Sequence, residues 1–428
     1  MTTVLAVAVF VIVYALIATE RVPRTVAALG GVAAVFGLGI VGAQEAFYSR
    51  QTGIDWNVIF LLLGMMLVVA GLRRTGLFEF LAIWSAKRTR GRPYPLLVLL
   101  CTLTAVASAL LDNVTTVLLV APVTLLVCNR LKLNPVPFLI AEVLASNIGG
   151  ASTLVGDPPN IIIGSRADLS FVDFVVNLGP IVVIVMVAFL LLSRFVFRDA
   201  FTYDPEAAES VMHLDEREAI ENPRALIRGM AVLVLVLIGF VLQRTLGIEP
   251  SIVALLGGGA MMLAVPGPTD EYMKQVEWET LVFFMGLFVL VGALVEVGAI
   301  DALASALTDA VGGDPVAATF GILFGSAALS AIVDNIPYVA TMAPVVDQLA
   351  TNDPALNPGN VLWWSLALGA DFGGNATAIG ASANVVVIGI AKRYGYPISF
   401  WQFTRYGLLV TVVSIALCVP YLWLRYLA

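Results

Sequence analysis

The sequence predicts an all-α membrane protein with about ten transmembrane helices and two re-entrant hairpins, arranged as two inverted repeats. Three observations predict this fold. The 428 residues are 60% hydrophobic and only 12% charged, which is far more apolar than a soluble domain of this length. The apolar runs are continuous and about twenty residues long, whereas a β-barrel would show short alternating segments. Motifs of the first half also recur in the second half.

Twelve apolar runs give the order of the crossings. Two of them, 95–128 and 316–349, are too long for one crossing, and an Asp-Asn pair interrupts each near its middle. We therefore expect each to form a hairpin that enters and leaves on the same side. The other runs, each counted as one crossing, lie at about 3–18, 25–42, 57–72, 136–164, 173–197, 226–243, 251–265, 280–297, 361–391 and 405–424.

The distribution of Lys and Arg supports this count and gives an orientation. With the N-terminus outside, 19 of the 23 basic residues fall in inner loops, and the exceptions are Arg50, Arg166, Arg244 and Arg425. Such an excess is the positive-inside signal of a multi-pass protein. It predicts that the polar loop 198–225 is cytoplasmic, and it leaves the membrane core free of Lys and Arg.

An internal repeat divides the chain into 1–197 and 226–428. Trp56 to Gly64 matches Trp278 to Gly286 at an offset of 222 residues, and the same offset carries the tip of hairpin 95–128 onto that of hairpin 316–349. Each half contains five crossings, an odd number, so the second half must be inverted relative to the first. Inverted repeats place a binding site at their interface near the midplane.

The runs 136–164 and 361–391 are predicted to be broken helices. The first contains N-I-G-G-A-S-T-L-V-G-D-P-P-N (Asn147 to Asn160), and the second contains D-F-G-G-N-A-T-A-I-G-A-S-A-N at an offset of 224. Gly149 and Gly150 permit φ values that a helix does not use, and Pro158 and Pro159 remove two backbone donors, so a continuous helix is not expected there. Broken backbone at this depth is tolerated where it lines a polar cavity.

The two hairpin tips and the two breaks therefore supply the candidate binding residues. A carboxylate inside the membrane costs several kcal/mol unless it is paired or protonated, so each intramembrane Asp is a functional candidate, the alternative being a cap of a tip or turn. The full candidate set is Asp112, Asn113, Thr115, Thr116, Asn147, Gly150, Ser152, Thr153, Asp157, Asn160, Asp334, Asn335, Asp371, Asn375, Thr377, Ser382 and Asn384.

These residue types favour a cation, a proton, or a small neutral hydroxylated solute over a polyanion, because the predicted core holds aspartates and no basic side chain. A channel is less consistent with inverted repeats and broken helices. A membrane enzyme would need a nucleophile with a base, or a metal set. Cys101, Cys128 and Cys418 are far apart, and His213 lies in the polar loop. We therefore expect no catalytic residues, no metal site and no cofactor.

At these motifs the chain resembles the ion transporter superfamily and, within it, the ArsB/NhaD group that includes the melanosomal P protein. The resemblance covers nearly the whole length and implies secondary transport: arsenite or antimonite extrusion, sodium/proton antiport, or chloride-related transport. Related sodium/dicarboxylate symporters carry Ser-Asn-Thr at the hairpin tips. Here the tips read Asp112-Asn113-Val114 and Asp334-Asn335-Ile336, which favours proton or cation antiport.

The expected function is a proton-coupled antiporter that exports arsenite, antimonite or Na⁺ across the plasma (inner) membrane. The alternatives are sodium-coupled citrate or dicarboxylate symport and chloride transport. The coupling ion is H⁺ or Na⁺, and the expected partners are a small inorganic ion or solute and the lipid bilayer. The superfamily implies a homodimer. The chain has no nucleotide-binding loop, so ATP drive would require a separate ATPase subunit, and no nucleic acid partner is expected.

Overall fold

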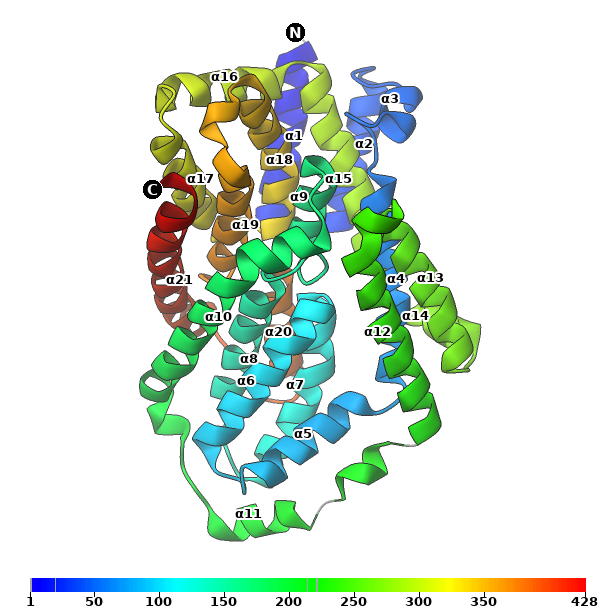
Figure 1. Ribbon diagram of the computed structural model, residues 1–428, viewed down its shortest axis with the longest axis vertical. Helices are drawn as coiled ribbons and strands as arrows, with labels where there is room; N and C mark the ends of the chain where they lie inside the picture. The colour runs from blue at the N-terminus through cyan, green and yellow to red at the C-terminus, as the bar shows by residue number, and fades with distance from the viewer. Residues whose placement is uncertain (1, 20, 214, 221) are drawn as a thin grey trace.

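The computed structural model describes residues 2–19, 21–213, 215–220 and 222–428 (Figure 1). Over these ranges every regular element is a helix. The first half of the chain forms α1 (Thr2–Ala18), α2 (Arg24–Gly37), α3 (Ala43–Tyr48), α4 (Trp56–Arg73), α5 (Leu77–Arg88), α6 (Pro93–Leu110), α7 (Asn113–Arg130), α8 (Pro135–Gly150), α9 (Pro158–Ala167) and α10 (Phe171–Val196).

The second half repeats this succession of long and short helices in the same order. It forms α12 (Pro223–Leu246), α13 (Pro250–Ala264), α14 (Thr269–Gln275), α15 (Trp278–Glu296), α16 (Ala299–Val311), α17 (Pro315–Ser330), α18 (Asn335–Asn352), α19 (Val361–Gly373), α20 (Ser382–Arg393) and α21 (Phe400–Leu422). Short 3₁₀ turns lie at Pro354–Leu356 and Pro358–Asn360, and a π-turn at Trp423–Leu427 closes the chain. The predicted fold class is therefore confirmed.

Each predicted hairpin consists of two antiparallel helices whose tip is fixed by its own aspartate. Asp112 precedes α7, and its Oδ1 accepts a hydrogen bond from the backbone N–H of Thr115 at 2.7 Å. Asp334 does the same for α18, with the N–H of Ile336 at 3.0 Å. A side chain at this position satisfies an N–H that the first helical turn leaves without a partner. The Asp-Asn pair therefore ends one helix and starts the next.

Both predicted broken helices are also present, but their glycines act differently from the sequence prediction. Gly149 and Gly150 lie within α8, and neither has a positive φ. A Cβ on Gly149 would lie 2.2 Å from the carbonyl oxygen of Ala105, and one on Gly373 would lie 2.6 Å from that of Ala327. The glycines are needed because each broken helix packs directly on the backbone of its hairpin. The helix is interrupted where the sequence predicted, between Gly150 and Pro158, but the glycines themselves remain helical.

The two repeats interlock. α2 of the first repeat packs against α15 of the second, and α13 of the second packs against α4 of the first. The same exchange occurs around the hairpins, since α9 packs on α18 and α20 packs on α7 (Figure 1). The centre of the molecule is consequently built from both halves of the chain.

The sequence reading missed the surface helices α5 and α16. They follow Gly76 and Gly298, which adopt the left-handed conformation with φ of 73° and 71°. Both helices are too short, and α5 too polar, to stand out as crossings. They connect α4 to one hairpin and α15 to the other, at corresponding places in the two repeats (Figure 1).

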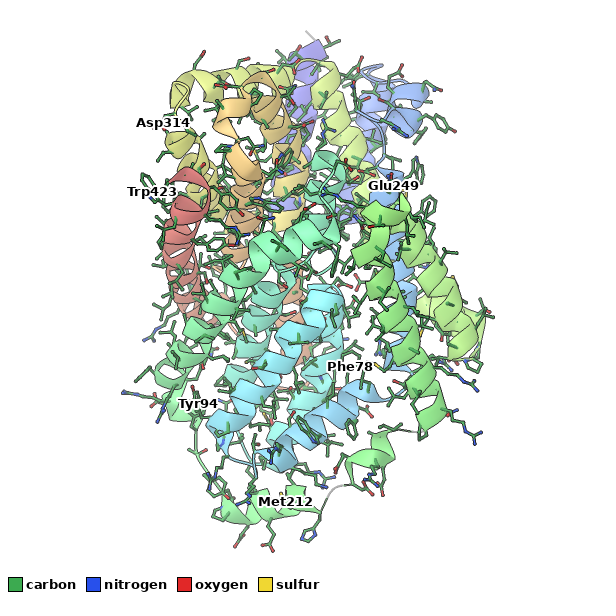
Figure 2. The ribbon with its side chains drawn as sticks, viewed as in Figure 1. Phe78, Tyr94, Met212, Glu249, Asp314 and Trp423 are labelled. Carbon is green, nitrogen blue, oxygen red and sulfur yellow. The ribbon has the colours of Figure 1, made fainter. Side chains whose placement is uncertain are left out.

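The loop predicted at 198–225 contains a short helix, α11 (Pro205–Met212), between two 3₁₀ turns, Arg198–Ala200 and Glu216–Ala219. Leu214 and Glu221 of this loop lie outside the described residues. Ala208 and Val211 of α11 are buried against α5 and α7. Figure 2 shows Met212 at one end of the molecule and Asp314, between α16 and α17, near the other.

Candidate functional site

The centre of the molecule holds a buried cluster of asparagine and aspartate side chains from both repeats. Asn113 begins α7 at the first hairpin tip, and its Nδ2 donates to Asp157 Oδ2 at 2.8 Å and to Asn147 Oδ1 at 3.1 Å. Asn335 occupies the corresponding position at the second tip and donates to the same Asp157 carboxylate at 3.4 Å. Asp157 therefore joins the two hairpin tips.

Asn147 connects the two broken helices. Its Nδ2 donates to Asn375 Oδ1 at 2.9 Å and to Asn384 Oδ1 at 3.0 Å, so one side chain of α8 binds both ends of the break between α19 and α20. All three asparagines are fully buried. The predicted meeting of the breaks at the repeat interface is thus present as direct hydrogen bonds.

Asp371 of α19 is the second carboxyl group of this cluster. It is fully buried close to Asn160 and Asp157, and neither Oδ1 nor Oδ2 has a hydrogen-bond partner within 3.5 Å in the described part of the chain. Three further atoms of the cluster are buried without a partner: Asn113 Oδ1, Asn160 Oδ1 and Asn375 Nδ2. Buried polar groups are normally hydrogen-bonded, so atoms like these are the ones a bound ion, water or solute would use.

The remaining residues of the two breaks hold the backbone in place. Thr153 Oγ1 donates to the carbonyl of Ala109 and Thr377 Oγ1 to that of Ala331, both at 2.6 Å, which ties each break to its own hairpin. Asn160 and Asn384 donate to carbonyls within their own break, and Ser152 Oγ donates to Gly149 O. Gly150 approaches Gly156 so closely that a Cβ would lie 2.5 Å from its carbonyl oxygen.

At the first hairpin tip, both oxygens of Asp112 are occupied by Thr115. The backbone N–H of Thr115 donates to Oδ1, and its hydroxyl donates to Oδ2 at 2.5 Å. This geometry is a helix cap, the alternative that the sequence left open for this residue. Thr116, one residue further, is buried with a hydroxyl that has no partner in the described structure.

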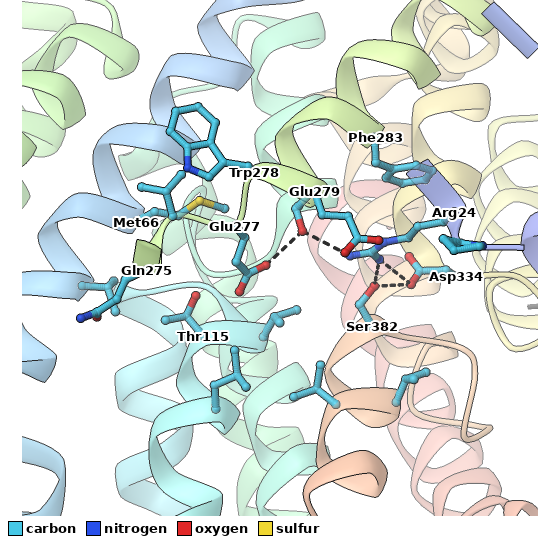
Figure 3. A pocket seen from close by; sticks show the side chains of 18 of the residues that line it. Arg24, Met66, Thr115, Gln275, Glu277, Trp278, Glu279, Phe283, Asp334 and Ser382 are labelled. Atoms are coloured by element: carbon cyan, nitrogen blue, oxygen red, sulfur yellow. Dashed lines mark hydrogen bonds and ion pairs between the residues drawn. The ribbon is translucent and has the colours of Figure 1, made fainter. Parts of the chain in front are cut away.

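A cavity of about 750 Å³ opens beside the hairpin tips (Figure 3). Its lining includes Thr115 of the first tip, Asp334 of the second and Ser382 at the start of α20. Asp334 is adjacent in sequence to Asn335, so the wall of this cavity lies one residue from the central cluster. The central asparagines themselves do not line it.

This cavity also holds a basic side chain, Arg24, which was not expected from the sequence. Arg24 Nη1 donates to Ser382 Oγ at 2.5 Å and lies 3.8 Å from Asp334 Oδ2, while Nη2 donates to Thr280 Oγ1 at 3.2 Å (Figure 3). The guanidinium also lies over the ring of Phe283. The expectation of a site without Lys or Arg was wrong, because the long side chain of a residue at a helix end reaches inward from the loop where the charge tally placed it.

Glu277, which directly precedes α15, lies in the same cavity and accepts from Thr280 Oγ1 at 3.0 Å. Burial raises the pKa of this carboxyl from 4.5 to about 7, with a further contribution from the negative charge of Asp112. The carboxyl therefore changes its charge near neutral pH. Neither Arg24 nor Glu277 stood out in the sequence, because both flank an apolar run where charged residues are ordinary.

A second cavity of about 1060 Å³ lies beside the part of α18 that is farthest from the tip of the second hairpin, and no residue of α6 or α7 lines it. Its lining contains three of the four basic residues predicted to be external, Arg50, Arg166 and Arg244. It also contains Leu154, Ile161 and Ile162, which flank the first break, but none of the candidate binding residues. Of these two cavities, the one that contains Arg24 reaches the hairpin tips.

No group of three or more His, Cys, Asp and Glu side chains that could hold a metal ion occurs in the described ranges. Cys101, Cys128 and Cys418 are free and buried, and His213 is exposed at the end of α11. Seven described helices have the length and composition of a membrane span, among them α4, α10, α12 and α15.

Comparisons with known proteins agree with this architecture. The model of the citrate transporter family matches residues 14–369. An uncharacterised transporter of Mycobacterium tuberculosis is 57% identical over 99% of both chains, and the human P protein is 33% identical over 98% of this chain and 59% of its own length. The structure of the YdaH transporter of Alcanivorax borkumensis superposes with a TM-score of 0.62 at 15% identity, covering 85% of this chain and 84% of the other. The chain belongs to the citrate transporter family of the ion transporter superfamily and is a multi-pass membrane transporter of the ArsB/NhaD-like group.

Proposed function

We propose that the protein is a proton-coupled antiporter that exports a small inorganic solute or cation, arsenite, antimonite or Na⁺, from the cytoplasm. The observation that carries this proposal is the pair of buried carboxyl groups, Asp157 and Asp371, within a cluster of asparagines from both repeats. Both oxygens of Asp371 lack a partner in the described structure. H⁺ is the proposed coupling ion, and the activity needs no cofactor.

Antiport follows from the cost of leaving such a carboxylate ionised. In a site closed to water it must carry a proton or lie next to a cation. A proton and a cation then compete for the same oxygens, so binding of one releases the other. The amide groups of Asn113, Asn160 and Asn375 supply the neutral oxygens and donors that Na⁺ or a hydroxylated solute would need in addition.

The two cavities provide the alternating access that such exchange requires. In the proposed orientation the N-terminus is outside the plasma membrane and the loop 198–225 is cytoplasmic. The cavity of Arg24 then opens to the cytoplasm and the cavity of Arg166 opens to the outside. The conformation described above is consequently an inward-facing one, and export requires the hairpins to move until the central cluster meets the second cavity.

A second candidate function is transport of a carboxylate such as citrate, and Arg24 favours it. Arg24 contacts Ser382, the first residue of α20, so a positive side chain and the N-terminal end of a helix lie together in the cavity. Both attract anions. A substrate carboxylate would replace Asp334 as the partner of Arg24, and the description of the family as citrate transporters agrees with this alternative.

Purified protein in proteoliposomes with an imposed pH gradient and an internal pH dye distinguishes these functions. Na⁺, Li⁺, arsenite, antimonite, chloride and citrate are added one at a time. Collapse of the gradient with arsenite or antimonite assigns metalloid/proton antiport, and collapse with Na⁺ or Li⁺ assigns cation/proton antiport. If none of these solutes collapses the gradient and the protein instead takes up citrate in a sodium-driven manner, the antiport proposal is overturned in favour of the second candidate.

A further inference from the structure

Glu142 is a carboxyl group that neither the fold nor the central cluster uses. It lies in the middle of α8, is only 2% exposed, and its Oε1 accepts a hydrogen bond from Thr124 Oγ1 of α7 at 2.6 Å. Its other oxygen, Oε2, is buried without a partner in the described residues. A carboxylate in the membrane with one hydrogen bond and no cation beside it is unstable by several kcal/mol, so this group holds a proton in the present conformation.

Among the described residues, no charged side chain acts on Glu142 to compensate for its ionisation. The titratable groups within its electrostatic range are the thiols of Cys101 on α6 and Cys128 on α7, both buried. Thr104 on α6 is buried as well, and its hydroxyl lacks a partner.

The second repeat shows that the fold does not need this carboxyl. At the repeat offsets, Glu142 corresponds to Leu366, Thr124 to Val346 and Cys101 to Leu323. All three counterparts are buried apolar side chains in the same arrangement of helices. The correspondence between the residues of the two repeats is supported by Gly149 and Gly373, which make equivalent contacts with their own hairpins. Leu and Val would serve a purely structural role equally well. The polar pair of Glu142 and Thr124 occurs in the first repeat and not in the second.

Polar side chains also lie between Glu142 and the central cluster, although no described hydrogen bond joins Glu142 to them. Ser146 lies one helical turn further along α8, on the same face. Its hydroxyl contacts Ser108 Oγ at 3.1 Å and the carbonyl of Asn113 at 3.2 Å, and Asn113 in turn donates to Asp157. Glu142 is five residues from Asn147, roughly 7.5 Å along the axis. In the second repeat the counterpart of Ser146 is Ala370, so this connection is absent there.

We infer that Glu142 is a second proton-binding site, distinct from the central cluster. Its place in the transport cycle rests on the proposed proton coupling. The protonation itself does not, because it can be measured without any flux.

Infrared difference spectroscopy of the full-length protein in lipid, recorded between acidic and alkaline pH, tests this inference. The wild type is expected to show the C=O band of a protonated buried carboxyl, and Glu142→Gln is expected to lose that band. The double variant Glu142→Leu with Thr124→Val copies the second repeat and should lose it too, which guards against misfolding of the single variant. Glu216→Gln, on the surface loop, should keep the band and serves as the control.

Flux measurements then separate the two proposals. If the wild type moves protons with its substrate, Glu142→Gln should shift the pH at which exchange is half-maximal, while Glu216→Gln should not. Loss of the band in Glu142→Gln supports the inference even if the wild type proves not to be proton-coupled. Infrared spectra of Glu142→Gln and of the double variant that superimpose on the wild type would overturn it, whatever the wild type transports.

Discussion

The substitution Asn147→Ala tests whether the two repeats are joined through one side chain. Asn147 accepts a bond from Asn113 and donates two bonds to the second repeat, at 2.9 and 3.0 Å. Three side-chain hydrogen bonds in a membrane protein contribute about 0.6 kcal/mol each, so the smallest loss of folding stability expected for Asn147→Ala is about 2 kcal/mol. The substitution also leaves the acceptors of Asn375 and Asn384 buried without donors. Each such acceptor costs up to about 3 kcal/mol, so the largest expected loss of folding stability is about 6 kcal/mol.

The assay is unfolding of the purified protein in detergent, followed together with substrate flux in proteoliposomes. Thr411→Ala is a matched control, because Thr411 is also buried and donates one hydrogen bond of 2.9 Å to the Phe372 carbonyl, but both residues belong to the second repeat. We expect the control to lose about 1 kcal/mol and to transport normally. Asn147→Ala should lose several times more stability and all coupled flux. Equal destabilisation of the two variants, with normal flux in both, would refute the bridging role.

Three further predictions concern packing, the cavity and pH. Gly149→Ala places a Cβ 2.2 Å from the Ala105 carbonyl oxygen and should destabilise the protein by about 1–3 kcal/mol or more. Gly179→Ala, which has open space around it, should not destabilise the protein. Thermal unfolding of both variants tests this difference. Arg24→Gln leaves Asp334 without its cation, so we expect this variant to bind substrate with a changed affinity. Arg24→Lys should restore only part of the wild-type affinity. Titration of flux against substrate concentration measures the affinity of both variants. The carboxyl of Glu277 has its pKa raised from 4.5 to about 7, so its ionisation destabilises the folded state progressively as pH rises from 4.5 to 7. Glu277→Gln should therefore add up to about 3 kcal/mol at pH 8 and nothing at pH 4, and melting curves that respond equally at both pH values would contradict this.

Much of the fold was predictable because membrane helices obey strong local rules. The apolar runs, the Asp-Asn pairs at Asp112 and Asp334, and the repeat offsets specify the crossings, the tips and the inversion. The helices α5 and α16 were missed because short surface helices carry no comparable length signal. The role of Gly149 was misjudged, since a close approach to another helix cannot be distinguished from backbone strain in a sequence.

The meeting of the hairpin tips and the broken helices was predictable, but the contacts of each individual carboxyl group were not. The asparagines of the tips and breaks do meet, yet Asp112 is bound by its own Thr115 and only Asp157 and Asp371 lie in the buried centre. Which carboxyl is capped and which is left unpaired depends on contacts between distant helices. Arg24 was missed because it flanks an apolar run, where charged residues are ordinary, and Glu142 was also missed. The intramembrane position of Glu142 was a signal that could have been used, since a lone carboxyl within an apolar run is rare.

The most direct test of the central claim is the proton flux of Asp371→Asn in proteoliposomes, measured beside the wild type with the substrate that collapses the wild-type gradient. The amide is nearly isosteric with the carboxyl but cannot carry a proton, and the removal of a buried ionisable group should leave the protein folded. We predict that substrate no longer collapses the pH gradient in this variant, although the protein unfolds at the wild-type temperature or above. Collapse of the gradient at the wild-type rate would contradict coupling through the central cluster.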